Sequence, residues 1–232
     1  MTVRYSHGGL TSKCVKQLCQ LYGTVMDSDH GTKPGKDERR AAILRIAHEA
    51  FLADGYAATS MSTIAARCGG SKATLYNYFS SKEELFLAVV RDRCDQVALV
   101  FDQELDVAEN LEAQLQRFGE HFLGLVLADE SVASYRMMIG ECARFPEIGQ
   151  TFYEAGPALG HTKLSVFFQG AIEKKLLRPT DTLAMARMFI HLCLADLHQR
   201  RLFNIGPKPD EAVISNNVAR AVRMLLATVG PV

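Results

Sequence analysis

The sequence predicts an all-α protein. After Asp37, apolar residues recur every three or four positions, which is the spacing of one helix face. No segment sustains the alternation of apolar and polar residues that is typical of a half-buried strand. Clusters of proline, glycine and polar residues separate the periodic segments at Pro146, at 178–181 and at 206–209. These observations predict a group of three helices followed by six further helices.

The composition is that of a globular protein. The chain of 232 residues is 48% hydrophobic and has a formal net charge of zero. A neutral chain is not a uniformly basic nucleic-acid coat, so any DNA affinity must come from a local cluster. Residues 36–82 contain seven Lys and Arg against four Asp and Glu. The six cysteines form no CxxC pair, and we find neither a signal peptide nor a bilayer-spanning run, so we expect a reduced, cytoplasmic protein.

Residues 1–35 have scattered glycines and no sustained period. We therefore expect a mostly disordered N-terminal extension, with a short helix near residues 12–22 as the alternative. Met26 opens a polar stretch typical of the tail before a first helix. This raises the hypothesis that translation starts at Met26, which mass spectrometry of the native N-terminus would decide.

The helices are expected in the following order. The first begins at Asp37 and ends at Gly55, a typical C-terminal cap, and its apolar stripe consists of Ile43, Ile46, Ala47, Ala50 and Phe51. After two short helices, the longer segments lie at about 82–105, 111–127, 132–143, 147–175, 182–201 and 210–228. Pro157 is expected to kink the longest of them.

Residues 59–79 have the pattern of two short helices joined by a tight turn. Ser60 and Ser71 are suitable N-caps for the two helices. Gly69 permits the turn, and Ala65, four residues earlier, is small enough for the helices to cross closely. The inner face contains Ile64, Cys68, Leu75 and Phe79, and the outer face Lys72, Ala73, Thr74, Tyr76 and Asn77. The second helix is therefore expected to be the recognition helix of a DNA-binding helix-turn-helix.

The chain resembles the TetR family of one-component regulators at residues 71–85, with the sequence SKATLYNYFSSKEEL, and at Gly55 and Tyr56 upstream. The resemblance is strong over residues 37–85 and rests on architecture beyond them. It implies a helix-turn-helix DNA-binding domain at 36–82 and a helical ligand-binding and dimerisation domain at 83–232. It also implies a homodimer that binds double-stranded operator DNA, usually a repressor, and is released by a small-molecule effector.

The resemblance also implies roles for individual residues. It assigns phosphate contacts to Lys72, Tyr76, Asn77 and Lys82, and base contacts to Ala73 and Thr74. Thr59 or Ser60 is expected to add a phosphate contact, and Ser71 leaves the first backbone amides of its helix open to another. Ser81 and Glu84 form an expected capping box that places Lys82 at a helix start.

Several of these positions have a structural alternative. Gly70 stands where family members have an apolar residue, so the turn would lose roughly 1.5–3 kcal/mol of side-chain burial. Tyr78 and Phe79 fit the core better than the DNA surface, and Cys68 fits ordinary packing. Thr74 could simply support the first turn of its helix. Arg39 and Arg40 are as consistent with solvation as with phosphate binding.

A ligand pocket is expected in the C-terminal part, because residues 136–147 and 152–157 resemble the sensor domain of a TetR subgroup. Its apolar walls would be Phe118, Phe122, Met137, Met138, Phe152 and Phe168, and its polar anchors Glu141, Arg144, His161 or His191. Ordinary core packing is the alternative for each Phe and Met. The effector is an unknown small molecule.

Dimerisation is expected on the last two helices. Their apolar stripes consist of Leu183, Ala186, Ile190, Cys193, Leu194 and Leu197 on the first, and Ile214, Val218, Ala221, Val222 and Leu225 on the second. Two such helices from each subunit would form a four-helix interface. A symmetric dimer also suits a palindromic operator with half-sites one or more helical turns apart.

An enzyme is the first competing interpretation. The chain has no HExxH, GxSxG or GxGxxG motif, and residues 31–36 lack the spacing and the Ser/Thr of a phosphate loop. His191 and His198 have no third ligand in the pattern, so we expect no metal, no cofactor and no catalysis. A ligand-independent DNA-binding protein and an activator stay open, because nothing in the sequence decides the sign of regulation.

Overall fold

The computed structural model describes residues 35–105 and 110–230, and the regular structure of this part of the chain is helical throughout. The first helices are α2 (Lys36–Asp54), α3 (Met61–Arg67), α4 (Lys72–Tyr76) and α5 (Lys82–Glu104). They are followed by α6 (Leu111–Val126), α7 (Asp129–Cys142), α8 (Pro146–Tyr153), η1 (Glu154–Ala158), α9 (Leu159–Glu173), α10 (Thr182–Leu202) and α11 (Glu211–Val229). The all-α prediction is confirmed. The expectations for the N-terminal extension and for Met26 lie outside the described residues.

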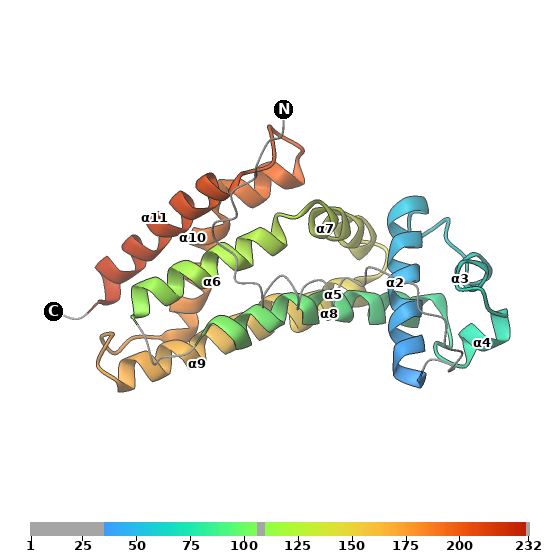
Figure 1. Ribbon diagram of the computed structural model, residues 1–232, viewed down its shortest axis with the longest axis horizontal. Helices are drawn as coiled ribbons and strands as arrows, with labels where there is room; N and C mark the ends of the chain where they lie inside the picture. The colour runs from blue at the N-terminus through green and yellow to red at the C-terminus, as the bar shows by residue number, and fades with distance from the viewer. Residues whose placement is uncertain (1–34, 106–109, 231–232) are drawn as a thin grey trace, which may run out of the picture. The chain divides into compact units, whose positions relative to one another are not determined.

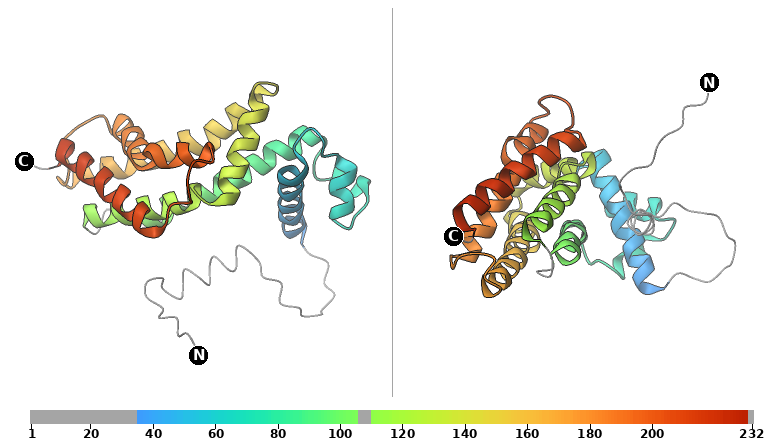
Figure 2. Two further views of the ribbon diagram at one scale, coloured as in Figure 1. Left: turned by 90° about the horizontal axis from the view of Figure 1, so that it is seen from above. Right: turned by 60° about the vertical axis from the view of Figure 1, so that its left-hand side comes forward.

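Helix α5 connects two groups of helices. Near its start it packs against α2, beside which α3 and α4 lie, and further along it contacts α6, α8 and α9 (Figure 1). Helix α11 packs against α6 and α10 (Figure 2). The recognition-helix candidate α4 therefore contacts α3, which packs on α2, and α2 packs on the long helix that enters the C-terminal group.

The predicted helix boundaries agree with the structure to within a few residues. The largest shift is at α7, which begins at Asp129 and not near residue 132. Asp129 and Glu130 occupy its first turn, where carboxylates are favoured by the helix dipole. Side-chain caps fix other starts: Asn110, Asp181 and Asp210 each accept bonds from backbone amides of the following turn.

The interruption expected at Pro157 is a π-helical turn. Residues of η1 widen the helix between α8 and α9, and Pro157 lies inside this turn. Proline has no backbone N–H to donate to the preceding turn, and a wider turn accommodates that missing bond. The long predicted segment 147–175 is therefore α8, η1 and α9 in succession.

The buried side chains form two clusters. The first joins α2, α3 and α4 to the start of α5, and also includes Met138 of α7 and Ile148 of α8. Its centre is aromatic, since the ring of Phe51 lies 5.0 Å from Phe86 and 5.6 Å from Tyr56. The second cluster joins the end of α5 to α6, α9, α10 and α11. The helix-turn-helix thus shares its core with α7 and α8.

The predicted dimer stripes need correction, because most of their residues belong to the core of the chain itself. Ala186, Ile190 and Cys193 are buried on α10, and so are Val218, Ala221, Val222 and Leu225 on α11. Large apolar side chains that are exposed on these two helices are Leu183, Met188, Val213 and Met224. An apolar period identifies the face that is buried and cannot distinguish burial within a subunit from burial between subunits.

The described cysteines carry no disulfide, and none of the described helices is both long and apolar enough to cross a membrane. Burial raises the pKa of Cys94 and that of Cys193 to about 12. Both are therefore neutral thiols that pack as small apolar groups.

Candidate nucleic-acid interface

Two serine caps define the helix-turn-helix. The Ser60 hydroxyl oxygen accepts a 3.1 Å bond from the Thr63 amide, and Ser71 accepts an equal bond from the Thr74 amide. Each serine has an extended backbone that directs the chain into its helix. Both predicted N-caps are therefore present.

The turn between α3 and α4 depends on Gly69. Its φ is +61°, a left-handed conformation that favours glycine. The amide of Gly70 donates to the carbonyl of Ala65 at 3.2 Å, and Ala65 is 4% exposed. These contacts close the turn tightly, as the spacing of Ala65 and Gly69 predicts.

Helix α4 has one buried and one open face. Leu75 lies in the first core cluster together with Phe79, which follows the helix. The exposed residues are Ser71, Lys72, Ala73, Tyr76 and Asn77, whereas Thr74 is half-buried. The Tyr76 side chain is 42% exposed, and the Lys72 ammonium lies 5.7 Å from the centre of its ring. The outer face is therefore the predicted one and is accessible to a partner.

Thr74 is less available than its exposed neighbours. Its hydroxyl oxygen lies 2.9 Å from that of Ser71, so both hydroxyls take part in the helix cap. A base contact of Thr74 would therefore use its methyl group, which takes no part in these hydrogen bonds.

Of the two alternatives Thr59 and Ser60, the Thr59 side chain is not open to the predicted phosphate contact. This side chain is 1% exposed, and its hydroxyl donates a 2.7 Å bond to the carbonyl of Gly55. A phosphate cannot reach this hydroxyl, which ties α3 to the end of α2. Ser60, by contrast, is exposed.

Lys82 is also engaged within the chain. Its ammonium donates a 2.9 Å bond to the carbonyl of Tyr56 and lies 4.4 Å from the centre of the Tyr56 ring. The capping box beside it is modified: Ser81 caps the Glu84 amide, but the Glu84 carboxylate accepts from Ser80 and not from Ser81. Lys82 thus fastens the start of α5 to the connection between α2 and α3.

The space beside Gly70 is filled by Arg39. The Arg39 guanidinium donates a 3.0 Å bond to the carbonyl of Cys68, and a Cβ at Gly70 would lie 3.2 Å from its Nη2. The expected loss of burial at Gly70 is thus offset by an arginine from α2. Sequence reasoning left Arg39 open because its partner is a backbone carbonyl distant in the chain.

The apolar residues of the predicted pocket are divided between the two core clusters. Phe118, Phe122 and Phe168 belong to the second core cluster, while Met137, Met138 and Phe152 pack in or against the first. Arg144 is exposed, and its guanidinium lies 5.2 Å from the ring of Phe145, whereas Glu141 is half-buried. His161 and His191 do lie together, with ring centres 6.4 Å apart.

Two buried polar atoms of the described residues have no hydrogen-bond partner. These are Nδ1 of His161 on α9 and Oε1 of Gln114 on α6. Phe101 connects their surroundings: its ring centre lies 4.8 Å from that of Phe118, and a Cβ at Gly160 would lie 2.8 Å from its Cζ. Gln114 was not predicted as a site residue, although a glutamine within the apolar stripe of α6 could have indicated a buried polar group.

Family models match both parts of the chain. Residues 43–89 match "Bacterial regulatory proteins, tetR family", and residues 113–231 match "AefR-like transcriptional repressor, C-terminal domain". The chain belongs to the TetR family of transcriptional regulators.

Individual relatives agree with this assignment. The chain is 36% identical over 108 residues to the HTH-type transcriptional activator FasR of Mycolicibacterium smegmatis, a match that covers 47% of this chain and 48% of FasR. It is 24% identical over 202 residues to the uncharacterized regulator YfiR of Bacillus subtilis, covering 85% and 95% of the two chains. The chain therefore spans about half the length of FasR but most of YfiR.

Solved structures show the same fold. A putative TetR-family regulator from Mesorhizobium loti superposes with a TM-score of 0.79 at 25% identity, covering 85% of this chain and 100% of that one. The flavonoid-responsive regulator FrrA gives 0.71 at 29% identity, covering 84% and 98%. The relatives and family models named here are all transcriptional regulators, which are typically not enzymes.

Proposed function

We propose that the chain is a homodimeric repressor that binds a palindromic operator and leaves it when a small-molecule effector binds. The DNA-binding role is supported by the exposed face of α4, whose opposite side is anchored in the core by Leu75. Residues 36–82 read DNA in this proposal, and residues 83–232 dimerise and bind the effector.

The proposed DNA contacts follow from exposure. Lys72, Tyr76 and Asn77 contact phosphates, with Ser60 and the amides after Ser71 as further phosphate contacts. Ala73 and the Thr74 methyl group meet base edges. Thr59 is not among the proposed DNA contacts, because its side chain is buried. Lys82 acts by holding the α2–α3 connection.

The dimer interface is proposed on the exposed apolar side chains of α10 and α11. Leu183 and Met188 are 38% and 40% exposed, and Val213 and Met224 are 44% and 52% exposed. Pairing of these faces in two copies would remove them from water and form the four-helix interface of the family.

The effector is proposed to enter the aromatic region around Phe101 and Phe118. The unpartnered atoms of His161 and Gln114 support this site, because a buried polar atom without a partner costs free energy that a ligand hydrogen bond would recover. An apolar ligand with at least one hydrogen-bonding group fits this chemistry. The name of FrrA, a flavonoid-responsive regulator, is consistent with such a class.

Activation is the second candidate function, favoured by the 36% identity to a stretch of an activator, FasR. The test begins with selection from a random duplex library by the purified chain, and the enriched duplex is then placed upstream of, or overlapping, a promoter in a transcription assay. Repression requires transcript levels to fall as the protein is added. A rise would establish activation, and the absence of any enriched duplex would overturn the DNA-binding role.

A further inference from the structure

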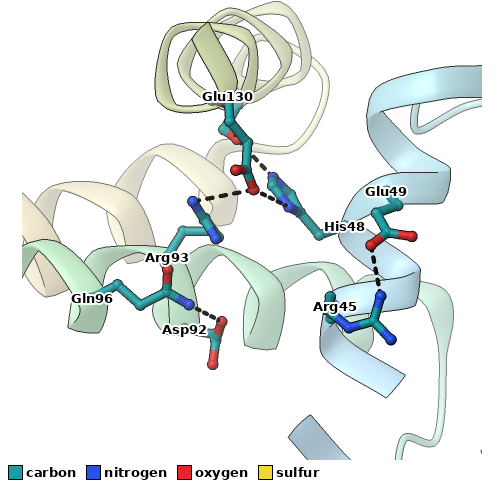
Figure 3. A network of polar contacts seen from close by, with 8 residues as sticks. Arg45, His48, Glu49, Asp92, Arg93, Gln96 and Glu130 are labelled. Atoms are coloured by element: carbon teal, nitrogen blue, oxygen red, sulfur yellow. Dashed lines mark hydrogen bonds and ion pairs between the residues drawn. The ribbon is translucent and has the colours of Figure 1, made fainter. Parts of the chain in front are cut away.

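A polar network with a buried centre joins α2 to α7. His48 on α2 is 4% exposed, and its Nε2 lies 2.7 Å from the hydroxyl oxygen of Ser134 on α7, which is also 4% exposed. Its Nδ1 lies 3.3 Å from the Glu130 carboxylate, one turn earlier on α7 (Figure 3). Arg93 of α5 contacts the same carboxylate oxygen at 3.3 Å. We refer to these four residues as the α2–α7 latch.

The Ser134 hydroxyl oxygen lies 2.7 Å from Nε2 of His48 and 2.8 Å from the backbone carbonyl oxygen of Glu130. With the proton of the neutral imidazole on Nδ1, His48 donates to the Glu130 carboxylate, and the single Ser134 hydroxyl proton is shared between Nε2 and that carbonyl. Burial and the nearby Arg93 guanidinium lower the pKa of His48 to about 4, against a raising effect of Glu49. The neutral form therefore prevails near neutral pH. Such bonds constrain distance and direction, whereas apolar contacts between helices tolerate small shifts.

Helix α2 transmits its own orientation to α4. The Arg39 guanidinium binds the carbonyl of Cys68 at the end of α3, and Phe51 lies in one core cluster with Leu75 and Phe79. The Thr59 hydroxyl fastens the start of α3 to the end of α2. A rotation of α2 against α7 must therefore move the recognition helix with it.

We propose that His48, Ser134 and Glu130 are positioning residues that fix the orientation of α2 to α4 against the C-terminal helices, and thereby restrict the half-site spacings that the dimer accepts. The inference rests on the proposed function. Each base pair added between half-sites turns one of them by about 34° and shifts it by about 3.4 Å. A latched dimer cannot follow such a change, whereas an unlatched dimer can reorient its reading helices.

The experiment measures spacing tolerance with the purified full chain. The wild type first selects a palindrome from random duplexes. This palindrome is then synthesised with its selected spacer, with a spacer one base pair shorter, and with spacers one and two base pairs longer. Dissociation constants are measured for the wild type, Ser134→Ala and Glu130→Gln. The matched control is Glu49→Gln, which alters an exposed ion pair with Arg45 (2.8 Å) on the same helix.

The wild type and Glu49→Gln should prefer the selected spacer to a similar degree. In Ser134→Ala, the ratio of dissociation constants between shifted and selected spacers should fall by about threefold or more, and Glu130→Gln should shift it in the same direction. Equal weakening at every spacing would mean a purely structural role and would overturn the inference, as would unchanged ratios.

Circular dichroism of each variant shows whether it folds. Should Ser134→Ala unfold, the ratio in Glu130→Gln decides the question, because the Glu130 side chain is 47% exposed and glutamine has nearly the same shape. Failure of the wild type to enrich any duplex would overturn the proposed function itself. If the wild type enriches a palindrome with one preferred spacer, and the variants keep the same preference, only the inference about the latch is overturned.

Discussion

The Arg39 guanidinium donates a 3.0 Å hydrogen bond to the carbonyl of Cys68 and covers the Cα side of Gly70. An arginine of the first helix therefore supports the turn of the helix-turn-helix from outside. The glycine at position 70 and the arginine at position 39 form one structural unit, although they are 31 positions apart in the sequence.

This relationship predicts energetic coupling between the two positions. Gly70→Leu, which restores an apolar side chain, should destabilise the wild type by about 1–3 kcal/mol because it displaces the guanidinium. In an Arg39→Ala background the same change should cost much less, since the space is then empty. Urea unfolding of both single variants and the double variant measures the coupling, and additive effects would disprove it.

Lys82 should act on stability more than on DNA affinity. Lys82→Met retains the aliphatic stem but removes the bond to the Tyr56 carbonyl, so we expect a loss of about 1 kcal/mol in the free energy of unfolding. The dependence of DNA affinity on salt should stay as in the wild type. A reduced salt dependence at unchanged stability would instead show that Lys82 contacts phosphate.

Gly119 is required for the close approach of α6 and α11. A Cβ at this position would lie 2.5 Å from Cγ1 of Val218, a stiff β-branched side chain. Gly119→Ala should therefore destabilise the chain by about 1–3 kcal/mol through overpacking. Combination with Val218→Ala should recover part of that loss in thermal unfolding. A Gly119→Ala chain as stable as the wild type would contradict the close contact.

The free energy of unfolding should fall on acidification. The pKa of His48 is about 4 in the folded chain, against an ordinary value of 6.5, so the folded state binds fewer protons between these values. The stabilisation is present above pH 6.5 and is lost as the pH falls towards 4. At pH 5 the loss from this residue is about 2 kcal/mol relative to neutral pH.

The matched variant for this prediction is His48→Gln, which cannot titrate. Burial also lowers the pKa values of His161 and His198, so the variant should keep part of the pH dependence. The difference between the two chains in urea unfolding at pH 7 and pH 5 isolates His48. Parallel pH profiles would show that His48 does not contribute.

Local patterns in the sequence were sufficient to predict the helices and the exposed face of α4. Apolar period, serine caps and the Gly69 turn are properties of neighbouring residues, and they predict α3, α4 and the outer position of Tyr76. The sequence could not exclude Thr59 as a phosphate contact. The partner of its hydroxyl, the carbonyl of Gly55, comes within reach only when the chain after α2 is folded.

Contacts between distant segments could not be predicted in the same way. An apolar stripe on α11 does not tell whether Val218 meets Gly119 of the same chain or a second subunit. The pairing of His48 with Ser134 joins residues 86 positions apart and carries no pattern in the sequence. Phe118 and Met138, both predicted as pocket walls, lie in different core clusters for a related reason, since helical spacing alone does not tell which core a residue joins.

The most direct test of the central claim is the salt dependence of binding to the selected duplex for the wild type and Lys72→Ala. A dimer that reads DNA through α4 should bind with a steep decline of log affinity against log salt, and Lys72→Ala should reduce that slope by about 2, one contact per subunit. A slope unchanged by Lys72→Ala, or wild-type binding insensitive to salt, would contradict the claim that the exposed face of α4 is the DNA-binding surface.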